Sequence, residues 1–501
     1  MSLQVPPKAD CCSRGDKPAE PLVFQKSTLG VRGVDLPPLD VPETLVPDEL
    51  RAAPLDLPEL GQHDITAHYT HLSDRNFSVD GNFYPLGSCT MKHNPRINEW
   101  AASLPGFASL HPLQDEDTIQ GALRLLYETR EFLEEISGLA EVSLQPAAGA
   151  HGEYTALKVI RAFFADMGEH DRSVVLAADT AHGTNPASCA MCGASVQQVR
   201  TSAGCTDLDH LRKVINEIGP SRVAAFMITN PSTAGVFDRH ITEVADVVHE
   251  AGAKVYLDGA NMNAMLGRVV PASLGVDAMH FNTHKTFSTP HGGGGPGAGP
   301  IAVTEELAPF LPVPQVMMAD DGSFYLDRDR KKSIGKVRSF IGQFGVLVRC
   351  WTYISACGPV GLRRVAETAV LSANYLASRL SDVYDMPYFD PSKGHYCAHE
   401  FVTVPERLLS QGVTLVDIAK RMIDYGVHPP TMHWPVHDCL MVEPTETESK
   451  RALDEFIAVM RQIAEEVESD SSLVTGAPSE ADIARADEVG AARKPVLVWT
   501  D

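Results

Sequence analysis

The amino-acid sequence predicts an α/β protein with a mostly parallel sheet in its larger domain and a second, smaller α/β domain towards the C-terminus. Two observations support this fold class. Short apolar runs alternate with helical stretches through the middle of the chain, which is typical of parallel strands connected by helices. Beyond about residue 370 the elements become fewer and longer, which indicates a change of domain. The apolar runs are 174–176, 223–228, 255–257, 278–281 and 301–303.

The 501 residues divide into three parts. Residues 1–115 comprise a proline-rich segment to about residue 60, expected to lie as an extended arm over the body or a partner, and an irregular polar segment expected to form an active-site loop. Residues 116–369 form the predicted large domain. Residues 370–501 form the predicted small domain, with a tail expected on the surface or against a partner.

The large domain is expected to begin with a helix over 118–139, because apolar residues recur there at helical spacing and Gly138 can end it. A strand-like stretch follows, then a turn of small residues, then a helical pattern over 154–164. A small-residue turn that opens a helix presents free N–H groups to an anion, so Gly149 and Ala150, with His151 as a further candidate, are predicted to bind a phosphate. Ordinary strand-to-helix turns have the same appearance.

Two helices and two strands are expected in the small domain, at 370–380 and 415–425 and at 399–404 and 440–443. Residues 445–448, Thr-Glu-Thr-Glu, match a capping box and predict that a further helix begins there and continues to about residue 467.

Composition restricts the function. Lys and Arg total 42 against 65 Asp and Glu, a net charge of −23, which disfavours nucleic-acid and anionic-membrane binding. No apolar run suits a signal peptide or a membrane span, so a cytoplasmic location is predicted. The 10 cysteines are scattered and predict free thiols. Cys189 and Cys192 have metal-site spacing but lack a second ligand pair, so no metal site is predicted.

Lys285 is the strongest candidate for chemistry. It follows the apolar run 278–281, with Thr283 and Thr286 beside it and a glycine-rich stretch after it. A lysine in this setting suits the Schiff base that holds pyridoxal phosphate (PLP). Asp258 ends a buried run 27 residues earlier (285 − 258), so both side chains can reach the same sheet edge, where a carboxylate can pair with the PLP pyridine nitrogen.

Five motifs in order give the chain a resemblance to a known family: the PLP-bearing subunit of the two-subunit glycine dehydrogenase (decarboxylating), the P-protein of the glycine cleavage system. The resemblance covers nearly the whole chain. The motifs are 84–92 (Tyr-Pro-Leu-Gly-Ser-Cys-Thr-Met-Lys), 181–188 (Ala-His-Gly-Thr-Asn-Pro-Ala-Ser), 284–287 (His-Lys-Thr-Phe) with 290–297, 428–432 (His-Pro-Pro-Thr-Met) and 443–448 (Glu-Pro-Thr-Glu-Thr-Glu).

The resemblance implies a PLP-dependent transferase type I fold. Lys285 would hold PLP covalently, Asp258 would face the pyridine nitrogen, and His151 would stack on the ring. Glycine would lose its carboxylate as carbon dioxide, and its aminomethyl group would pass to the lipoyl disulfide of the H-protein. The implied partner is a homologous subunit 1 (alpha), in an α2β2 heterotetramer.

Further site residues are candidates from their polar clusters at predicted strand ends. The sequence leaves open whether these groups contact ligand or only satisfy local turns. The additional cofactor-binding candidates are Thr184, Asn185, Ala260 and His284. The candidates for substrate contact or a lid are Ser88, Cys89, Thr90, His182 and His291.

Three alternatives remain at the sequence level. The glycines at 292, 294 and 297 fit a dinucleotide-binding fingerprint, but Pro296 interrupts it and no suitable acidic residue follows. A non-catalytic scaffold subunit would be expected to lack Lys285 or Asp258, and both are present. Another PLP reaction, such as transamination or aldol cleavage, is the third alternative.

Overall fold

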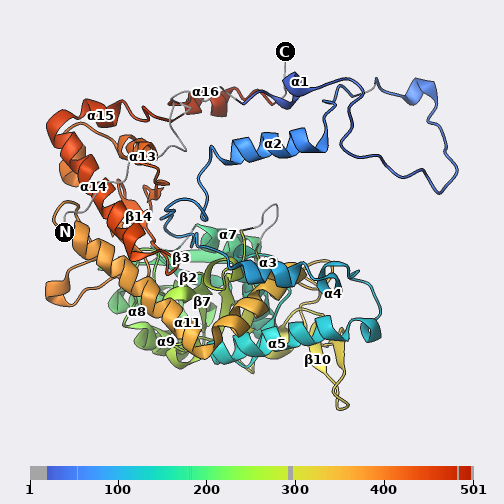
Figure 1. Ribbon diagram of the computed structural model, residues 1–501. Helices are drawn as coiled ribbons and strands as arrows, with labels where there is room; N and C mark the ends of the chain where they lie inside the picture. Colours follow the sequence, from blue (N-terminus) through green and yellow to red (C-terminus); the bar gives the residue numbers. More distant parts are fainter. Residues whose placement is uncertain are drawn as a thin grey trace.

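The computed structural model describes residues 20–53, 55–179, 181, 183–291, 297–481 and 484–497. The large domain is built on a seven-stranded sheet, and the small domain is built on a three-stranded sheet. Element α11 (Phe344–Leu380) consists of two helical segments joined at a kink at Gly358, and it runs from one domain into the other (Figure 1). Its first part packs in the large-domain core, and its residues from Ala373 onward belong to the small-domain core.

The large sheet has the strand order β1-β9-β8-β7-β6-β2-β3. Neighbouring strands from β3 to β8 are parallel, whereas β9 is antiparallel to both of its neighbours. All five predicted runs are strands. The edge strand β3 was not predicted, because its side chains are largely exposed and polar. The strands are β1 (Glu141–Ser143), β2 (Val174–Ala178), β3 (Ser195–Val199), β6 (Val223–Thr229), β7 (Lys254–Gly259), β8 (Ala278–Phe281) and β9 (Ile301–Val303).

Helices cover both faces of this sheet, as parallel strands require. Alternate strand residues point to opposite faces, so Leu257 and Phe226 pack in one core and Tyr256 and Met227 in another. The first core includes residues of helices α5 (Gln120–Ser137), α8 (Leu208–Ile218) and α9 (Ile241–Glu250), and the second includes residues of α6 (Gly149–Asp166) and α7 (Thr184–Met191).

Two predicted helices of the large domain are present with changed bounds. Helix α5 ends at Gly138, whose φ of 69° is left-handed, as expected of a glycine in that position. Helix α6 begins at Gly149, earlier than the predicted residue 154. The small residues of the predicted turn therefore form the first turn of α6.

The small domain contains β12 (Phe401–Thr403), β13 (Thr431–Met432) and β14 (Leu440–Val442), with helices α13 (Leu415–Asp424) and α14 (Lys450–Asp470). The predicted capping box at 445–448 is wrong. Helix α14 begins five residues later, and Ser449 is its N-cap, accepting a hydrogen bond from the Ala452 N–H. Thr445 is instead buried and has a left-handed φ of 56°.

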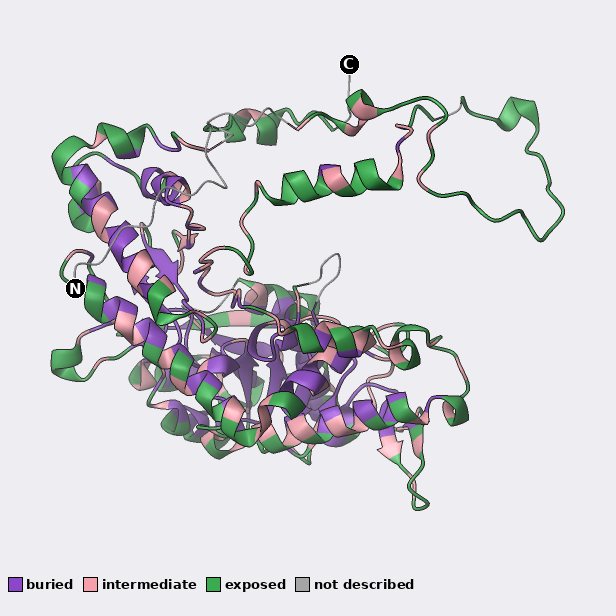
Figure 2. Ribbon diagram, in the orientation of Figure 1, coloured by how far each residue is buried: buried purple, intermediate pink, exposed green. Residues whose placement is uncertain are grey.

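The N-terminal arm is extended and largely exposed over its described part, with a short helix α1 (Val23–Lys26) (Figure 2). The following segment is less irregular than predicted, because it contains helices α2 (Gln62–Ser73), α3 (Arg96–Ala102) and α4 (Pro105–Ala108). None of the described helices combines the length and hydropathy needed to cross a membrane.

The remaining elements are short. They are α10 (Thr283–Thr286), α12 (Glu406–Leu409), α15 (Ser472–Thr475), α16 (Glu488–Arg493), β4 (Thr201–Ser202), β5 (Cys205–Thr206), β10 (Gln315–Met318) and β11 (Phe324–Asp327), with short 3-10 turns between other elements.

Candidate active site

The candidate site lies at the carboxyl ends of the parallel strands. Thr229, Asp258 and His280 are register neighbours on β6, β7 and β8, so the sheet itself places them side by side. Lys285 lies on α10, directly after β8. These four residues line a cavity of about 240 Å³, together with residues of the first turn of α6. Parallel sheets bind ligands at this edge.

Lys285 is 8% exposed and lies between the sheet and the predicted active-site loop. Its ammonium Nζ donates a hydrogen bond to the backbone carbonyl of Ser88 at 2.6 Å. Ser88 has a φ of 66°, which is unusual for a residue other than glycine. The loop therefore meets the lysine in a strained conformation.

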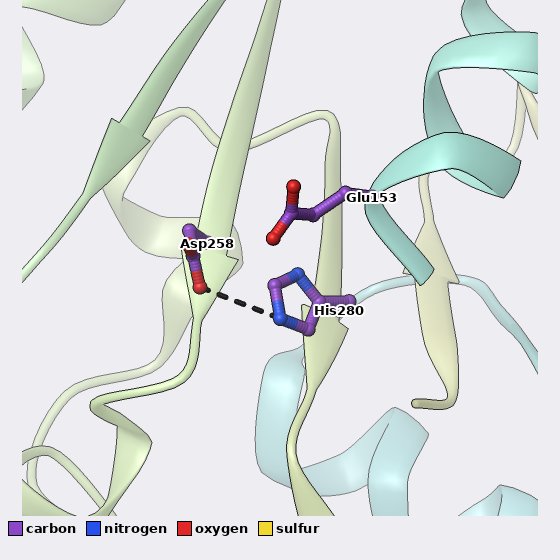
Figure 3. Close-up of side chains that lie close together, drawn as sticks. All are labelled: Glu153, Asp258 and His280. Atoms are coloured by element: carbon purple, nitrogen blue, oxygen red, sulfur yellow. Dashed lines mark ion pairs between the residues drawn. The ribbon is translucent and has the colours of Figure 1, made fainter. Parts of the chain in front are cut away.

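Asp258 is held in place by hydrogen bonds to both carboxylate oxygens. Oδ1 accepts from the Ala260 N–H at 3.0 Å and Oδ2 from the Asn185 side-chain amide at 3.3 Å. His280 Nε2 lies 3.4 Å from Oδ1 (Figure 3). Burial opposes ionisation, but the His280 ring, the Ala260 N–H and the Lys285 ammonium together lower the pKa of Asp258. Asp258 is thus a buried, oriented carboxylate.

Two residues beside Asp258 that the sequence did not single out, Glu153 and His280, also line the cavity (Figure 3). Glu153 accepts hydrogen bonds from Thr184 Oγ1 at 2.8 Å and from Ser188 Oγ at 3.0 Å. Burial and the nearby Asp258 charge raise its pKa. The His280 Nδ1 atom lies 2.5 Å from the Tyr256 hydroxyl.

The first turn of α6 offers a site for an anion. Its N-cap, Ala148, has no side-chain cap, so the first N–H groups of the helix lack that partner. A side chain at Gly149 would clash, because a Cβ there would lie 2.1 Å from Asn282 Oδ1. Asn282 Oδ1 and His284 Nδ1 are buried without a hydrogen-bond partner among the described residues.

These features fit PLP. A phosphate suits the N–H groups at the N-terminus of α6, and the unpartnered Nδ1 of the neutral His284 ring can donate a hydrogen bond to it. Burial, His291 and Lys285 lower the pKa of His284 to about 3, so this ring is neutral at physiological pH. Asp258 and Lys285 line the same cavity, as an aldehyde-bearing pyridine ring would require.

Most predicted cofactor residues come together here. Gly149, Ala150, Thr184, Ala260, His284, Asp258 and Lys285 line the cavity, and Asn185 binds Asp258 from behind it. His151 does not line it. Its ring Nδ1 accepts a hydrogen bond from the Ala147 N–H at 3.1 Å, and burial and Arg338 lower its pKa. His182, the glycines 292–295 and Pro296 lie outside the described residues.

The substrate and lid candidates form the opposite side of the site. Ser88 lines the cavity, whereas Cys89, Thr90 and His291 do not. Cys89 Sγ lies 3.5 Å from His291 Nδ1, and burial raises the pKa of the thiol. The His291 ring meets His284 edge to face, with centroids 4.9 Å apart. These contacts link the loop to the lysine-bearing helix.

The small domain holds this loop in place. The Ser88 N–H donates to Glu400 Oε2 at 2.7 Å, and Thr90 Oγ1 donates to Glu443 Oε1 at 2.6 Å. The buried Lys92 ammonium donates to Glu446 Oε1 at 2.6 Å and to the Thr286 carbonyl at 2.9 Å. Sequence reasoning missed both Glu400 and Glu443 as site residues, although Glu443 opens one of the five motifs.

The two cysteines with metal-site spacing belong to a hydrophobic core. Cys189 and Cys192 are free and buried, and the Cys189 thiol lies 3.4 Å from the sulfur of Met227. Burial raises the pKa of Cys189 to about 12 and that of Cys192 to about 11, so these thiols stay protonated and unreactive.

Comparisons with known proteins agree with this geometry. The family model "Glycine dehydrogenase, C-terminal domain" matches residues 365–481, and "Aminotransferase class-V" matches residues 152–307. A probable glycine dehydrogenase (decarboxylating) subunit 2 from Bacillus licheniformis is 52% identical over 484 residues, covering 95% of this chain and 98% of the relative. The chain belongs to the glycine dehydrogenase (decarboxylating) subunit 2 family. A relative of the same name from Halalkalibacterium halodurans is also 52% identical, covering 95% of this chain and 97% of its own.

Two solved structures have the same fold as this member of the glycine dehydrogenase subunit 2 family. A crystal structure of glycine decarboxylase (P-protein) of the glycine cleavage system matches with a TM-score of 0.68 and 21% identity, covering 83% of this chain and 93% of that one. A cysteine desulfurase from Thermococcus onnurineus matches with a TM-score of 0.58 and 16% identity, covering 77% and 95%. The predicted type I fold and the family resemblance are therefore confirmed.

Proposed function

We propose that this chain uses PLP to decarboxylate glycine and transfers the remaining aminomethyl group to the lipoyl disulfide of an H-protein, as the catalytic step of a glycine cleavage system. Family membership supports the reaction. The observation that carries the residue assignment is that Lys285, Asp258 and the first turn of α6 line one cavity.

In this proposal Lys285 would hold the cofactor covalently, Asp258 would pair with its ring nitrogen, and the first turn of α6 with His284 would bind its phosphate. When bound, PLP supplies an electron sink for the charge that remains on glycine when its carboxylate leaves. Asp258 keeps that ring nitrogen protonated, because its own pKa is lowered and it therefore stays ionised. Asn185 and Ala260 fix the carboxylate orientation.

Two groups beside Asp258 maintain its charge. His280 lies beside the carboxylate and is itself oriented by the Tyr256 hydroxyl. Burial and the Asp258 charge raise the pKa of Glu153, which opposes a second negative charge next to Asp258. Both contribute through Asp258, without touching the reacting atoms. His151 remains a proposed ring-stacking residue only because it lies on the same first turn of α6 as the cavity residues.

On the other side of the cavity, the Ser88 carbonyl offers a hydrogen-bond acceptor to the Lys285 amine whenever the lysine is free of the cofactor. Ser88, Cys89 and Thr90 are proposed to shape the glycine-binding side. The proposed partner is a homologous subunit 1, since the relatives are named as subunit 2. An α2β2 assembly, the H-protein partner and a cytoplasmic location remain proposals from the sequence.

The test is borohydride reduction of the purified chain with PLP, alone and with the partner subunit, followed by peptide mapping. The expected adduct is on Lys285. Lys92 is a built-in control, because it is also buried but is engaged by Glu446. An adduct on Lys92 alone, or none in either sample, would contradict the proposal. Exchange of labelled bicarbonate into the glycine carboxyl, dependent on lipoylated H-protein, then distinguishes this reaction from transamination or aldol cleavage.

A further inference from the structure

A second cluster of titratable side chains lies next to the cavity but outside it. His399 and Glu400 precede β12, and Glu443 follows β14. All three are at most 1% exposed. One candidate ligand atom from each lies within 4.8 Å of the others. The small domain therefore brings two carboxyl groups and an imidazole together in a site closed to solvent.

Only some of the polar atoms in this cluster have hydrogen-bond partners. Glu400 Oε2 is bound by the Ser88 N–H, and Glu443 Oε1 by Thr90 Oγ1 and by Asn263 Nδ2 at 3.0 Å. The other oxygen of each glutamate, and both ring nitrogens of His399, have no hydrogen-bond partner within the described residues. His399 Nε2 lies 3.5 Å from Glu400 Oε1, and buried polar atoms are seldom left unpaired, so at least one further proton is expected within this cluster.

The charges point to the same conclusion. The Lys285 ammonium is the cation whose field favours ionisation of both carboxylates. Lys92 is engaged by Glu446, and burial with the Lys285 charge lowers the pKa of His399 to about 3, so that ring is neutral. The neighbouring Cys89 thiol is protonated, since burial raises its pKa. Besides Asp258, whose charge Lys285 also favours, two further buried carboxylates thus face this one ammonium, and a buried excess of negative charge is strongly unfavourable.

We propose that Glu400 and Glu443 share one proton and act as a pair of positioning residues for Lys285. The pair then presents a single negative charge to the lysine ammonium, where two ionised glutamates would present two. Its two hydrogen bonds to the loop hold Ser88 in its left-handed conformation, with the Ser88 carbonyl directed at Lys285 Nζ. This inference rests on the proposed function. Lys285 needs a hydrogen-bond acceptor and a nearby negative charge when glycine displaces it from the cofactor.

The acidities of the two groups are consistent with this arrangement. Burial and the adjacent Glu443 raise the pKa of Glu400. Burial raises the pKa of Glu443 to about 7, against the opposing effects of Thr90 and Lys285. When two carboxyl groups interact this strongly, their protons belong to the pair and are not assigned to one residue.

The direct test is infrared difference spectroscopy of the full chain at pH 7 in H2O and D2O. It detects the carbonyl stretch of a protonated carboxyl group, which shifts on deuteration. We expect a wild-type band that disappears in Glu400→Gln and also in Glu443→Gln, because removal of either partner lets the other ionise. Loss of the band in only one variant, or in neither, would overturn the proposal.

Controls make the assignment specific. Glu448 is a partly buried glutamate of the same motif whose pKa burial raises to about 7. The Glu448→Gln variant should remove only its own band. If a glutamine variant fails to fold, Glu400→Asp and Glu443→Asp replace it, and each should shift the shared band. A divalent metal ion that stays bound in one-to-one ratio after dialysis would also overturn the proposal, because it would take the place of the proton.

A second readout measures the effect on Lys285. The rate of adduct formation with PLP at one pH is followed by borohydride trapping. Each single glutamine variant keeps one negative charge and should react at close to the wild-type rate, whereas the double variant loses that charge and should react about tenfold faster. Equal acceleration in the single variants would contradict sharing. Absence of any Lys285 adduct in the wild type would instead contradict the proposed function, and the infrared result would stand separately.

Discussion

Buried carboxyl groups on the two sides of the site, the large-domain wall and the small-domain wall, differ in their hydrogen bonds and in the direction of their pKa shifts. On the large-domain wall, Asp258 has hydrogen bonds on both oxygens and His280 beside it, and its pKa is lowered. On the small-domain wall, Glu400 and Glu443 each have one oxygen without a partner, and their pKa values are raised. The comparison shows that partners decide whether a buried carboxylate is charged, since all three groups are equally inaccessible to water.

The walls also differ in how they form. Asp258 and His280 are register neighbours on adjacent strands, so formation of the sheet brings them together. Glu400 and Glu443 meet the loop at Ser88 and Thr90, which are separated from them by 312 and 353 residues in the chain. The small-domain wall therefore depends on assembly of three distant parts of the chain, and Lys285 lies between the two walls.

Removal of the Lys285 amine, which lies between the two walls, should have the largest effect on exchange. Lys285→Ala should lower glycine–bicarbonate exchange in the complex with subunit 1 and H-protein by about 10⁴-fold, the upper range for a single proton-transferring group. Lys254→Ala is the control, because this lysine pairs with Glu306 away from the cavity. Exchange by Lys285→Ala at more than a tenth of the wild-type rate would argue against a covalent role.

Loss of the Asp258 charge on the large-domain wall should have the second-largest effect on exchange. Asp258→Asn keeps the shape of the side chain but removes the negative charge opposite the cofactor nitrogen, and exchange should fall by about 10²- to 10³-fold. Asp277→Asn is a matched control: this aspartate also borders β8 and binds His249 at 2.8 Å, but it lies before the strand begins. It should alter stability more than exchange. Equal losses of exchange in both variants would show that the loss does not depend on the position of Asp258 in the cavity.

The ion pair of the small-domain wall should affect stability. Lys92 and Glu446 are almost fully buried, 2.6 Å apart. Lys92→Met leaves the Glu446 carboxylate without its partner and should lower the free energy of unfolding by about 3 to 5 kcal/mol. The double variant Lys92→Met with Glu446→Gln should recover part of this loss in urea unfolding. A double variant no more stable than the single one would show that the pair acts mainly by packing.

The smallest effect concerns pH. The pKa of Glu448 is about 7 in the folded chain and about 4.3 when unfolded. Between these values the folded state binds more protons, so Glu448 makes stability fall as pH rises from about 4.3 to about 7, with no further change above. Glu448→Gln should make this decline shallower in thermal unfolding at pH 5 and pH 8. An unchanged slope would show that burial does not shift this group.

Much of the fold was predictable because the signals are local. Strands β2, β6, β7, β8 and β9 and helix α5 follow from apolar periodicity and from Gly138. Helix α14 was misplaced because Thr445 and Glu448 match a capping box, although buried contacts hold Thr445 in a left-handed conformation that a cap cannot adopt. Ser449, which lacked the capping-box pattern, is the actual cap.

From the sequence alone the fold class and the family could be predicted, and Lys285 and Asp258 could be proposed for the site, because all of these depend on short motifs at the ends of apolar runs. Only the tertiary structure decided that His280 and Glu153 support Asp258, that His151 lies outside the cavity lining, and that Glu400 and Glu443 meet behind Ser88. The physical reason is that ionisation and hydrogen bonding depend on neighbours in space, and those neighbours lie up to several hundred residues apart in the chain.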